Sequence, residues 1–140
     1  VSHRTLPAPG RAWLSLRILL LWLVLGLTSW ARPASDLKVM RRASHIYVRI
    51  SLRNPTTVWQ GHLNIRCWAR RTKVGPWLLL REWKQVPPLG PGQRLIRELF
   101  DQSSPTLRLL AATGPIEVRA LISGQGLHLQ EERSLPAQKN

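Results

Sequence analysis

Hydrophobic and polar residues alternate with a period of two along several stretches of the chain. Residues 46–52 place apolar side chains at every second position, with polar or aromatic side chains between them. Residues 116–122 repeat this arrangement, and residues 63–69 follow it with Leu, Ile, Cys and Ala on one side. Successive side chains of a strand point to opposite faces, so this period predicts strands with one buried face and one wet face.

Less regular segments extend the strand pattern. Further strands are predicted at residues 37–40, 77–86, 94–100 and 127–129, and residues 107–112 fit either a strand or a short helix. Three leucines at 78–80 predict burial on both faces. Breaks fall at Asn54-Pro55-Thr56-Thr57, at residues 74–76, in the Pro-Gly stretch 87–92 and at Gly114-Pro115. About seven short strands with turns at roughly 8–12-residue spacing predict an all-β, antiparallel β-sandwich.

The turns also carry a resemblance to a known family. The segments VRISLRNPTT from Val48, LGPGQ from Leu89 and GPIEVRALI from Gly114 occur in that order. This order resembles an immunoglobulin-like sandwich, and it is similar to the CARDB-type and related adhesion-like modules of exported bacterial proteins. The resemblance covers residues 36–123. It implies a spacer, adhesion or assembly role and no catalytic residues.

The first 31 residues follow a different pattern. Three arginines precede the apolar run ILLLWLVLGL at 18–27, small residues follow, and no carboxylate occurs before Asp36. This order predicts a secretory signal peptide cut after Ala31. Residues 12–31 are alternatively long enough for a retained hydrophobic helix anchored in the inner membrane, if Arg17 snorkels, and a buried core helix is the third reading. The predicted domains are a signal peptide or anchor (1–31), a β-sandwich (32–134) and a disordered tail (135–140).

Composition narrows the chemistry. The 140 residues contain 21 Lys and Arg but 7 Asp and Glu, for a net charge of +14. One cysteine excludes an internal disulfide framework. The histidines share no metal-ligand spacing, and no nucleophile or phosphate-loop motif occurs. We therefore expect no enzyme, metal or cofactor; an enzyme would need Asp36 or Glu117 gathered with a histidine.

Basic and aromatic residues alternate on the wet sides of two predicted strands. If residues 46–53 and 63–70 pair as a hairpin with Ile50 opposite Ile65, Arg49 faces Arg66 and Tyr47 faces Trp68. Like charges directly opposite each other destabilise a sheet, so such a face predicts an anionic partner. The predicted binding residues are Tyr47, Arg49, Arg66, Trp68 and Arg70.

The class of partner expected for this basic face depends on whether the protein is exported. An extracytoplasmic protein, periplasmic or secreted, would meet an envelope protein, an envelope polymer or anionic lipid. The prediction is therefore an exported or membrane-anchored, non-enzymatic binding or assembly module of the cell envelope. An ordinary solvated basic face is the plain alternative. A single-stranded nucleic-acid-binding, OB-like barrel is the other, and the export signal makes nucleic acid the less favoured partner.

Two further expectations concern the interior. Four tryptophans fall at positions 59, 68, 77 and 83, and with one Phe and one Tyr in the chain we expect at least two of them in the core. Cys67 lies on the inward side of its strand and is expected to be a buried free thiol.

Overall fold

The computed structural model of the chain describes residues 17–20, 32–112 and 114–138. Residues 17–20 are helical, and the rest of the predicted signal peptide or anchor lies outside the described residues. Within those described ranges, no helix is both long enough and apolar enough to cross a membrane.

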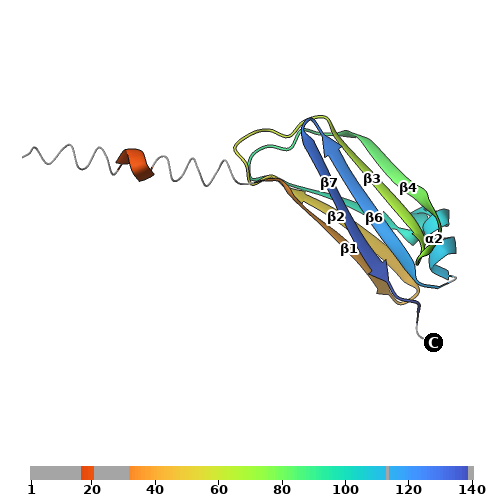
Figure 1. The fold of residues 1–140 in the computed structure, drawn as a ribbon. Coiled ribbons are helices and arrows are strands. Elements are labelled where there is room, and N and C mark those ends of the chain that lie inside the picture. The colour runs from red at the N-terminus through yellow and green to blue at the C-terminus, as the bar shows by residue number, and fades with distance from the viewer. Residues whose placement is uncertain (1–16, 21–31, 113, 139–140) are drawn as a thin grey trace, which may run out of the picture. The chain divides into compact units, whose positions relative to one another are not determined.

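In the described residues, seven strands form two antiparallel sheets (Figure 1), which confirms the all-β sandwich. The first sheet has three strands in the order β1-β2-β5, and the second has four in the order β4-β3-β6-β7. The strands are β1 (Ala34–Arg42), β2 (His45–Arg53), β3 (Leu63–Arg71), β4 (Val74–Val86), β5 (Arg94–Phe100), β6 (Ile116–Gly124) and β7 (Leu127–Leu135).

The predicted hairpin between β2 and β3 is wrong. β2 pairs with β1 and β5, whereas β3 pairs with β4 and β6 in the other sheet. Residues 54–62 therefore carry the chain from one sheet to the other. Both strands have a complete apolar side, and placing them in facing sheets buries the two sides against each other.

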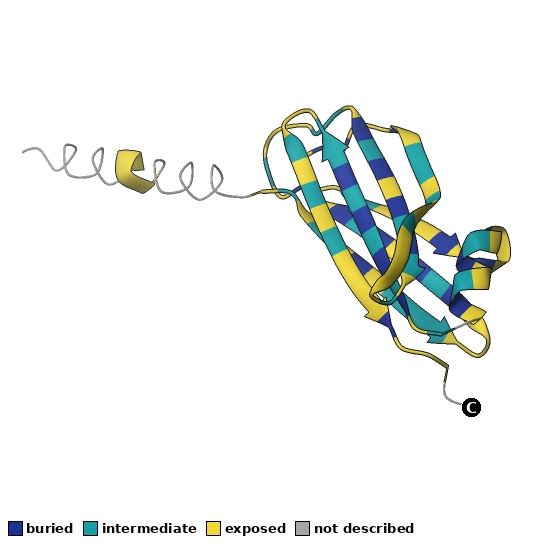
Figure 2. Cartoon of the chain, turned by 45° about the vertical axis from the view of Figure 1, so that its right-hand side comes forward, coloured by how far each residue is buried: buried dark blue, intermediate teal, exposed yellow. Residues whose placement is uncertain are grey.

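The core fills the space between the sheets, and Figure 2 shows burial alternating along β2, β3 and β6. Aliphatic side chains supply nearly all of it. Its inward positions on the three central strands are Ile46, Val48, Ile50 and Leu52 of β2, Leu63, Ile65, Cys67 and Ala69 of β3, and Ile116, Val118, Ala120 and Ile122 of β6.

Several segments differ from their predicted form. The β4 strand begins at Val74, inside the predicted break, because an edge strand accepts Pro76 without losing a ladder bond. Leu78 and Leu79 are 39% and 48% exposed, so burial on both faces is wrong for this edge strand. The ambiguous segment is helical: α2 (Pro105–Ala112) buries Leu107. The last strand, β7, ends at the buried Leu135, one residue into the predicted tail.

Each of the four edge strands carries a charged side chain at an inward position. Arg41 of β1, Arg81 of β4, Arg97 of β5 and Arg133 of β7 pair in register with buried residues of the neighbouring strand. Inward charges on edges oppose edge-to-edge association, since another sheet would have to bury them. The edge strands are therefore poor templates for the addition of another strand.

Tryptophan contributes little to this core. Trp59 is 62% exposed, Trp68 and Trp77 are half-buried on an outward face, and Trp83 packs against the core while partly exposed. The expectation of two core tryptophans is therefore wrong. Branched aliphatic residues fill the interior, because strands in two closely packed sheets present short side chains to each other.

The Cys67 thiol is fully buried and free, as expected. Burial raises the pKa of this thiol to about 12, so the reactive thiolate is scarce at ordinary pH. We expect the native protein not to react with Ellman's reagent at mildly alkaline pH and to react fully once denaturant unfolds it. Rapid modification of the native chain would contradict the inward placement of this strand face.

Candidate functional site

The five predicted binding residues lie on opposite outer faces of the sandwich. Tyr47 and Arg49 belong to the β2 face, defined as the outward side chains of β1, β2 and β5. Arg66, Trp68 and Arg70 belong to the β3 face, the outward side chains of β4, β3, β6 and β7. The structure thus splits the predicted site into two groups, because β2 and β3 run in different sheets.

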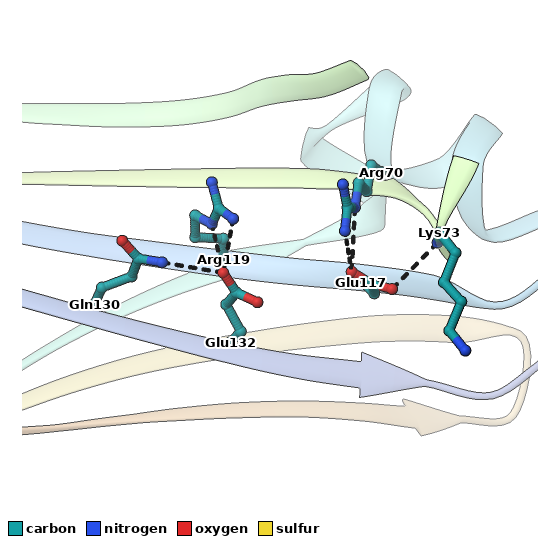
Figure 3. Close-up of polar contacts among 6 residues, drawn as sticks. All are labelled: Arg70, Lys73, Glu117, Arg119, Gln130 and Glu132. Carbon is teal, nitrogen blue, oxygen red and sulfur yellow. Dashed lines mark hydrogen bonds and ion pairs between the residues drawn. The ribbon is translucent and has the colours of Figure 1, made fainter. Parts of the chain in front are cut away.

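Arginines on the β3 face are opposite glutamates rather than one another. Three of them have a glutamate as their direct cross-strand partner, and opposite charges in that position stabilise a sheet. The pairs are Arg66 with Glu82 at 3.5 Å, Arg70 with Glu117 at 2.9 Å and Arg119 with Glu132 at 2.7 Å. Figure 3 shows the second and third pairs side by side across β3, β6 and β7. These arginines are therefore neutralised within the protein.

The aromatic residues of the β3 face are also engaged by its own arginines. The Trp77 ring has the guanidinium carbon of Arg70 at 4.3 Å and that of Arg119 at 4.1 Å from its centroid. Such cation–π contacts hold the indole and both guanidinium groups in place. Trp68 lies opposite Leu79 and Arg119 in register. The arginines of the β3 face are thus paired with its own glutamates and aromatic rings, which leaves little net charge to attract a ligand.

The ionisation of Glu117 on the β3 face is expected to make the free energy of unfolding depend on pH in the acidic range. Hydrogen bonds from Arg70 lower the pKa of this carboxyl below its ordinary value of 4.5, and the backbone N–H of Lys73 adds to the effect. A carboxyl whose folded pKa is lowered stabilises the fold above its unfolded pKa, and that contribution is lost as the pH falls through the folded pKa. We expect Glu117→Gln to flatten the fall in unfolding free energy below about pH 4.5, measured by urea unfolding across acidic pH. Arg70→Gln should flatten it similarly; an unchanged slope in both variants would contradict this assignment.

A compact polar cluster occupies the centre of the β2 face. The Tyr47 hydroxyl donates a hydrogen bond to Glu98 at 2.7 Å and accepts one from Nε of Arg49 at 2.6 Å. Arg49 also reaches Glu98 at 3.2 Å. Desolvation raises the pKa of Tyr47, and the hydrogen bond to Glu98 adds to the rise. The hydrogen bond to Tyr47 raises the pKa of Arg49, so the phenol stays protonated and the guanidinium stays charged at neutral pH.

A shallow hollow of about 580 Å³ lies over this cluster and the adjacent end of the face. The Tyr47 and Phe100 rings form an aromatic wall, with centroids 5.1 Å apart and planes tilted by 47°. Met40 adds an apolar side chain opposite Tyr47. Lys38 and Arg42 line the rim. The hollow therefore combines flat apolar surface with positive charge.

Cations outnumber carboxylates on the β2 face by five to two. Lys38 lies directly opposite Arg49, and Arg53 directly opposite Arg94. In the described part of the chain, no carboxylate comes within ion-pair distance of four of these cations, which are Lys38, Arg42, Arg53 and Arg94. The predicted pair of Arg49 with Arg66 is therefore wrong, and the like charges that lie opposite each other on this face are Lys38 with Arg49 and Arg53 with Arg94.

Sequence reasoning missed one contact at the far end of the hollow. Nδ1 of His45 lies 3.5 Å from a carboxylate oxygen of the buried Asp101, and both residues line the hollow. The two are far apart in sequence and share no motif, so only the pairing of β2 with β5 brings them together. Among the described contacts, Asp36 pairs with Arg133 and Glu117 with Arg70, and neither meets a histidine. The described residues contain no cluster of three metal-ligating side chains.

These sheets and faces define an antiparallel, two-sheet β-sandwich with one charge-balanced face and one basic, hollowed face. No protein-family model matches the chain, CARDB-type modules included, and no curated protein matches it. Among solved structures it is similar to the sporulation control protein Spo0M from Bacillus subtilis, with 8% identity, a TM-score of 0.47, and coverage of 79% of this chain and 51% of that chain. It is also similar to β-glucosidase 3B from Thermotoga neapolitana, with 17% identity, a TM-score of 0.46, and coverage of 76% of this chain and 17% of that chain. The chain thus spans about half of the first protein and a small part of the second.

Proposed function

We propose that the chain is an exported or membrane-anchored, non-enzymatic binding module of the cell envelope that holds an anionic partner on its β2 face. The observation that carries this proposal is the set of unpaired cations around the aromatic hollow. Every glutamate-paired arginine of the β3 face is already neutralised, whereas Lys38 and Arg42 line the hollow with no carboxylate of the described residues within ion-pair distance. A surplus of one sign over a concave surface attracts ligands of the other sign.

An immunoglobulin-like sandwich is the more specific class that we propose for the domain. Its support is the strand order, with strands one, two and five in one sheet and strands three, six and seven together in the other. That partition corresponds to the A-B-E and C-F-G strands of immunoglobulin-like sandwiches, with β4 added beside β3. Domains of this architecture present whole faces to partners, in keeping with an adhesion or assembly role.

The chemistry of the hollow suits holding a ligand rather than transforming it. The groups of Tyr47, Arg49 and Glu98 satisfy one another, so no strong base or nucleophile is left free at the centre. Aromatic faces stack on flat, weakly polar surfaces such as sugar rings, and guanidinium and ammonium groups bind carboxylates or phosphates. An acidic envelope polysaccharide combines both features and is the partner class that we propose for this face.

Export is tested by cell fractionation of the full chain after expression in a bacterial host. We expect either a product that begins at Arg32 in an extracytoplasmic fraction or the intact chain in the membrane fraction. Intact chain in the cytosol would contradict export.

Binding is tested with the full chain and labelled alginate, an acidic polysaccharide, with neutral dextran as the control. We expect binding to alginate that weakens as salt is raised, since exposed charge pairs are screened, and none to dextran. Equal behaviour of both polymers would contradict the proposal. The rival is tested with a labelled oligothymidylate, because a face that reads single strands would prefer it to alginate. The chain's two separate sheets differ from the OB-like barrel that this alternative predicted.

A further inference from the structure

Residues 54–62, which connect the two sheets, present two large apolar side chains to solvent. Val58 is 64% exposed and Trp59 is 62% exposed, and they are adjacent in sequence. An exposed tryptophan beside an exposed valine is costly in water, because both leave apolar area hydrated. Trp combines a large apolar ring with one polar N–H, which suits a boundary between apolar and wet surroundings.

Hydrogen bonds and a ring contact fix the conformation of residues 54–62, so the exposure of Val58 and Trp59 is a property of the folded structure. The buried Asn54 amide donates to the carbonyls of Val58 at 2.8 Å and Leu89 at 3.0 Å. Backbone bonds in both directions join Gln60 to Leu89. The Trp59 ring lies against Gly90, where an added Cβ would come within 3.0 Å of it. The indole is therefore held by one edge while most of it faces outward.

Two unpaired arginines lie at the base of this connection. Arg53 ends β2 and Arg94 begins β5, and the two are direct cross-strand partners. Like charges in this position destabilise a sheet unless something anionic lies over them. The carboxylates that the structure describes lie beyond ion-pair distance of both side chains. The exposed apolar pair thus sits beside a concentrated positive charge.

The chain enters the domain at this same end. Ala34, the first residue of β1, pairs with Arg53. The apolar run of residues 18–27 ends at Leu27, and the seven steps from there to Ala34 extend at most about 25 Å. An anchored apolar run would therefore keep this end of the sandwich near the membrane surface.

We propose that this end of the sandwich, formed by Arg53, Val58, Trp59 and Arg94, docks on an anionic lipid surface. Val58 and Trp59 enter the interfacial region, as aromatic residues do at membrane boundaries, while the two guanidinium groups contact lipid phosphates. The β2 hollow and the β3 face then remain free at the sides. This inference rests on the membrane-anchored form of the proposed function and names the surface that the domain itself contacts.

The test places an environment-sensitive nitrobenzoxadiazole label on the full chain. The label goes on Val58→Cys, or on Ser44→Cys in the β1–β2 turn at the opposite end as the matched control; the buried Cys67 stays unlabelled in the native protein. Labelled chains are floated with vesicles of phosphatidylcholine alone or with phosphatidylglycerol added, and quenching by iodide is measured. We expect the label at 58 to be shielded only in anionic vesicles and the label at 44 to stay accessible in both. Arg53→Gln should lower the ratio of shielded to exposed label at 58 about fivefold, the effect of one basic residue near an anionic surface.

The outcomes distinguish failure of the proposed docking surface from failure of the proposed N-terminal membrane anchor. If the chain floats with both vesicles while the label at 58 stays accessible, the docking surface is wrong and the anchor stands. If the chain floats only with anionic vesicles and the label at 58 is shielded, the docking surface stands and the anchor is wrong. Flotation with neither overturns both. Equal shielding at 58 and 44 also overturns the docking surface, because it shows contact without a defined end.

Discussion

Replacing Asn54 with alanine is expected to lower the free energy of unfolding by about 3 kcal/mol. The side chain is fully buried and takes part in four hydrogen bonds. Its Nδ2 donates to Val58 and Leu89, and its Oδ1 accepts from the backbone N–H and the hydroxyl of Thr56. Each bond contributes about 1 kcal/mol net. The loss of four bonds is partly offset, because the Leu89 carbonyl keeps the backbone N–H of Gln60 and the Val58 carbonyl keeps the Thr56 hydroxyl. Equilibrium urea unfolding of the variant and the parent measures the difference.

Two further variants show whether the amide is the cause. Thr57→Ala changes an exposed residue of the same connection and is expected to alter stability by less than about 0.5 kcal/mol. Asn54→Asp keeps the acceptor for Thr56 but removes both amide bonds, and it should lose a large part of the stability that alanine loses. If Asn54→Ala were as stable as Thr57→Ala, the Asn54 amide would not be what holds residues 54–62 to the Pro-Gly stretch 87–92.

Neutralising the rim of the hollow is expected to weaken alginate binding about tenfold. Lys38→Gln with Arg42→Gln removes two unpaired cations that line the hollow. Exposed charge contacts contribute about 0.5–1 kcal/mol each, so losing two corresponds to roughly a tenfold change in affinity. Stability should not fall, because each side chain faces a basic residue or a histidine across the strand pair. Fluorescence anisotropy at low salt, with urea unfolding in parallel, measures both quantities.

The matched control removes the same charge elsewhere. Arg71→Gln with Lys84→Gln takes two exposed cations from β3 and β4, the strands of the other sheet. We expect this pair to leave alginate affinity within about twofold of the parent, since only general attraction changes. Equal loss in both pairs would show that total charge, rather than the hollow, attracts the polymer.

Charge pairing explains why the predicted site divides. In a hairpin of β2 with β3, Arg49 would have faced Arg66. In the structure Arg49 faces Glu98 and Arg66 faces Glu82, so each arginine gains a favourable cross-strand partner. Strand pairing thus separates these two arginines, and Arg66 avoids the cost of a like charge directly opposite. That cost persists where Lys38 lies opposite Arg49 and where Arg53 lies opposite Arg94, and the proposed function and the docking surface rest on these positions.

Alternation alone was sufficient to predict the three central strands, their inward faces and the burial of Cys67. These are local properties, because a period of two shows in every central strand which side chains avoid water. The edge strand β4 and the tryptophans were predicted poorly, since an edge exposes residues that the same letters would bury in a central strand.

Which strands pair is a property of the whole chain. The patterns of β2 and β3 are equally compatible with a hairpin and with facing sheets, because both arrangements put the same side chains inward. Facing sheets win because two apolar sides then cover each other, and because the long-range pairings place glutamates opposite arginines. The basic hollow of the β2 face, the contact of His45 with Asp101 and the braced Trp59 all follow from that choice, so they exist only in the folded molecule.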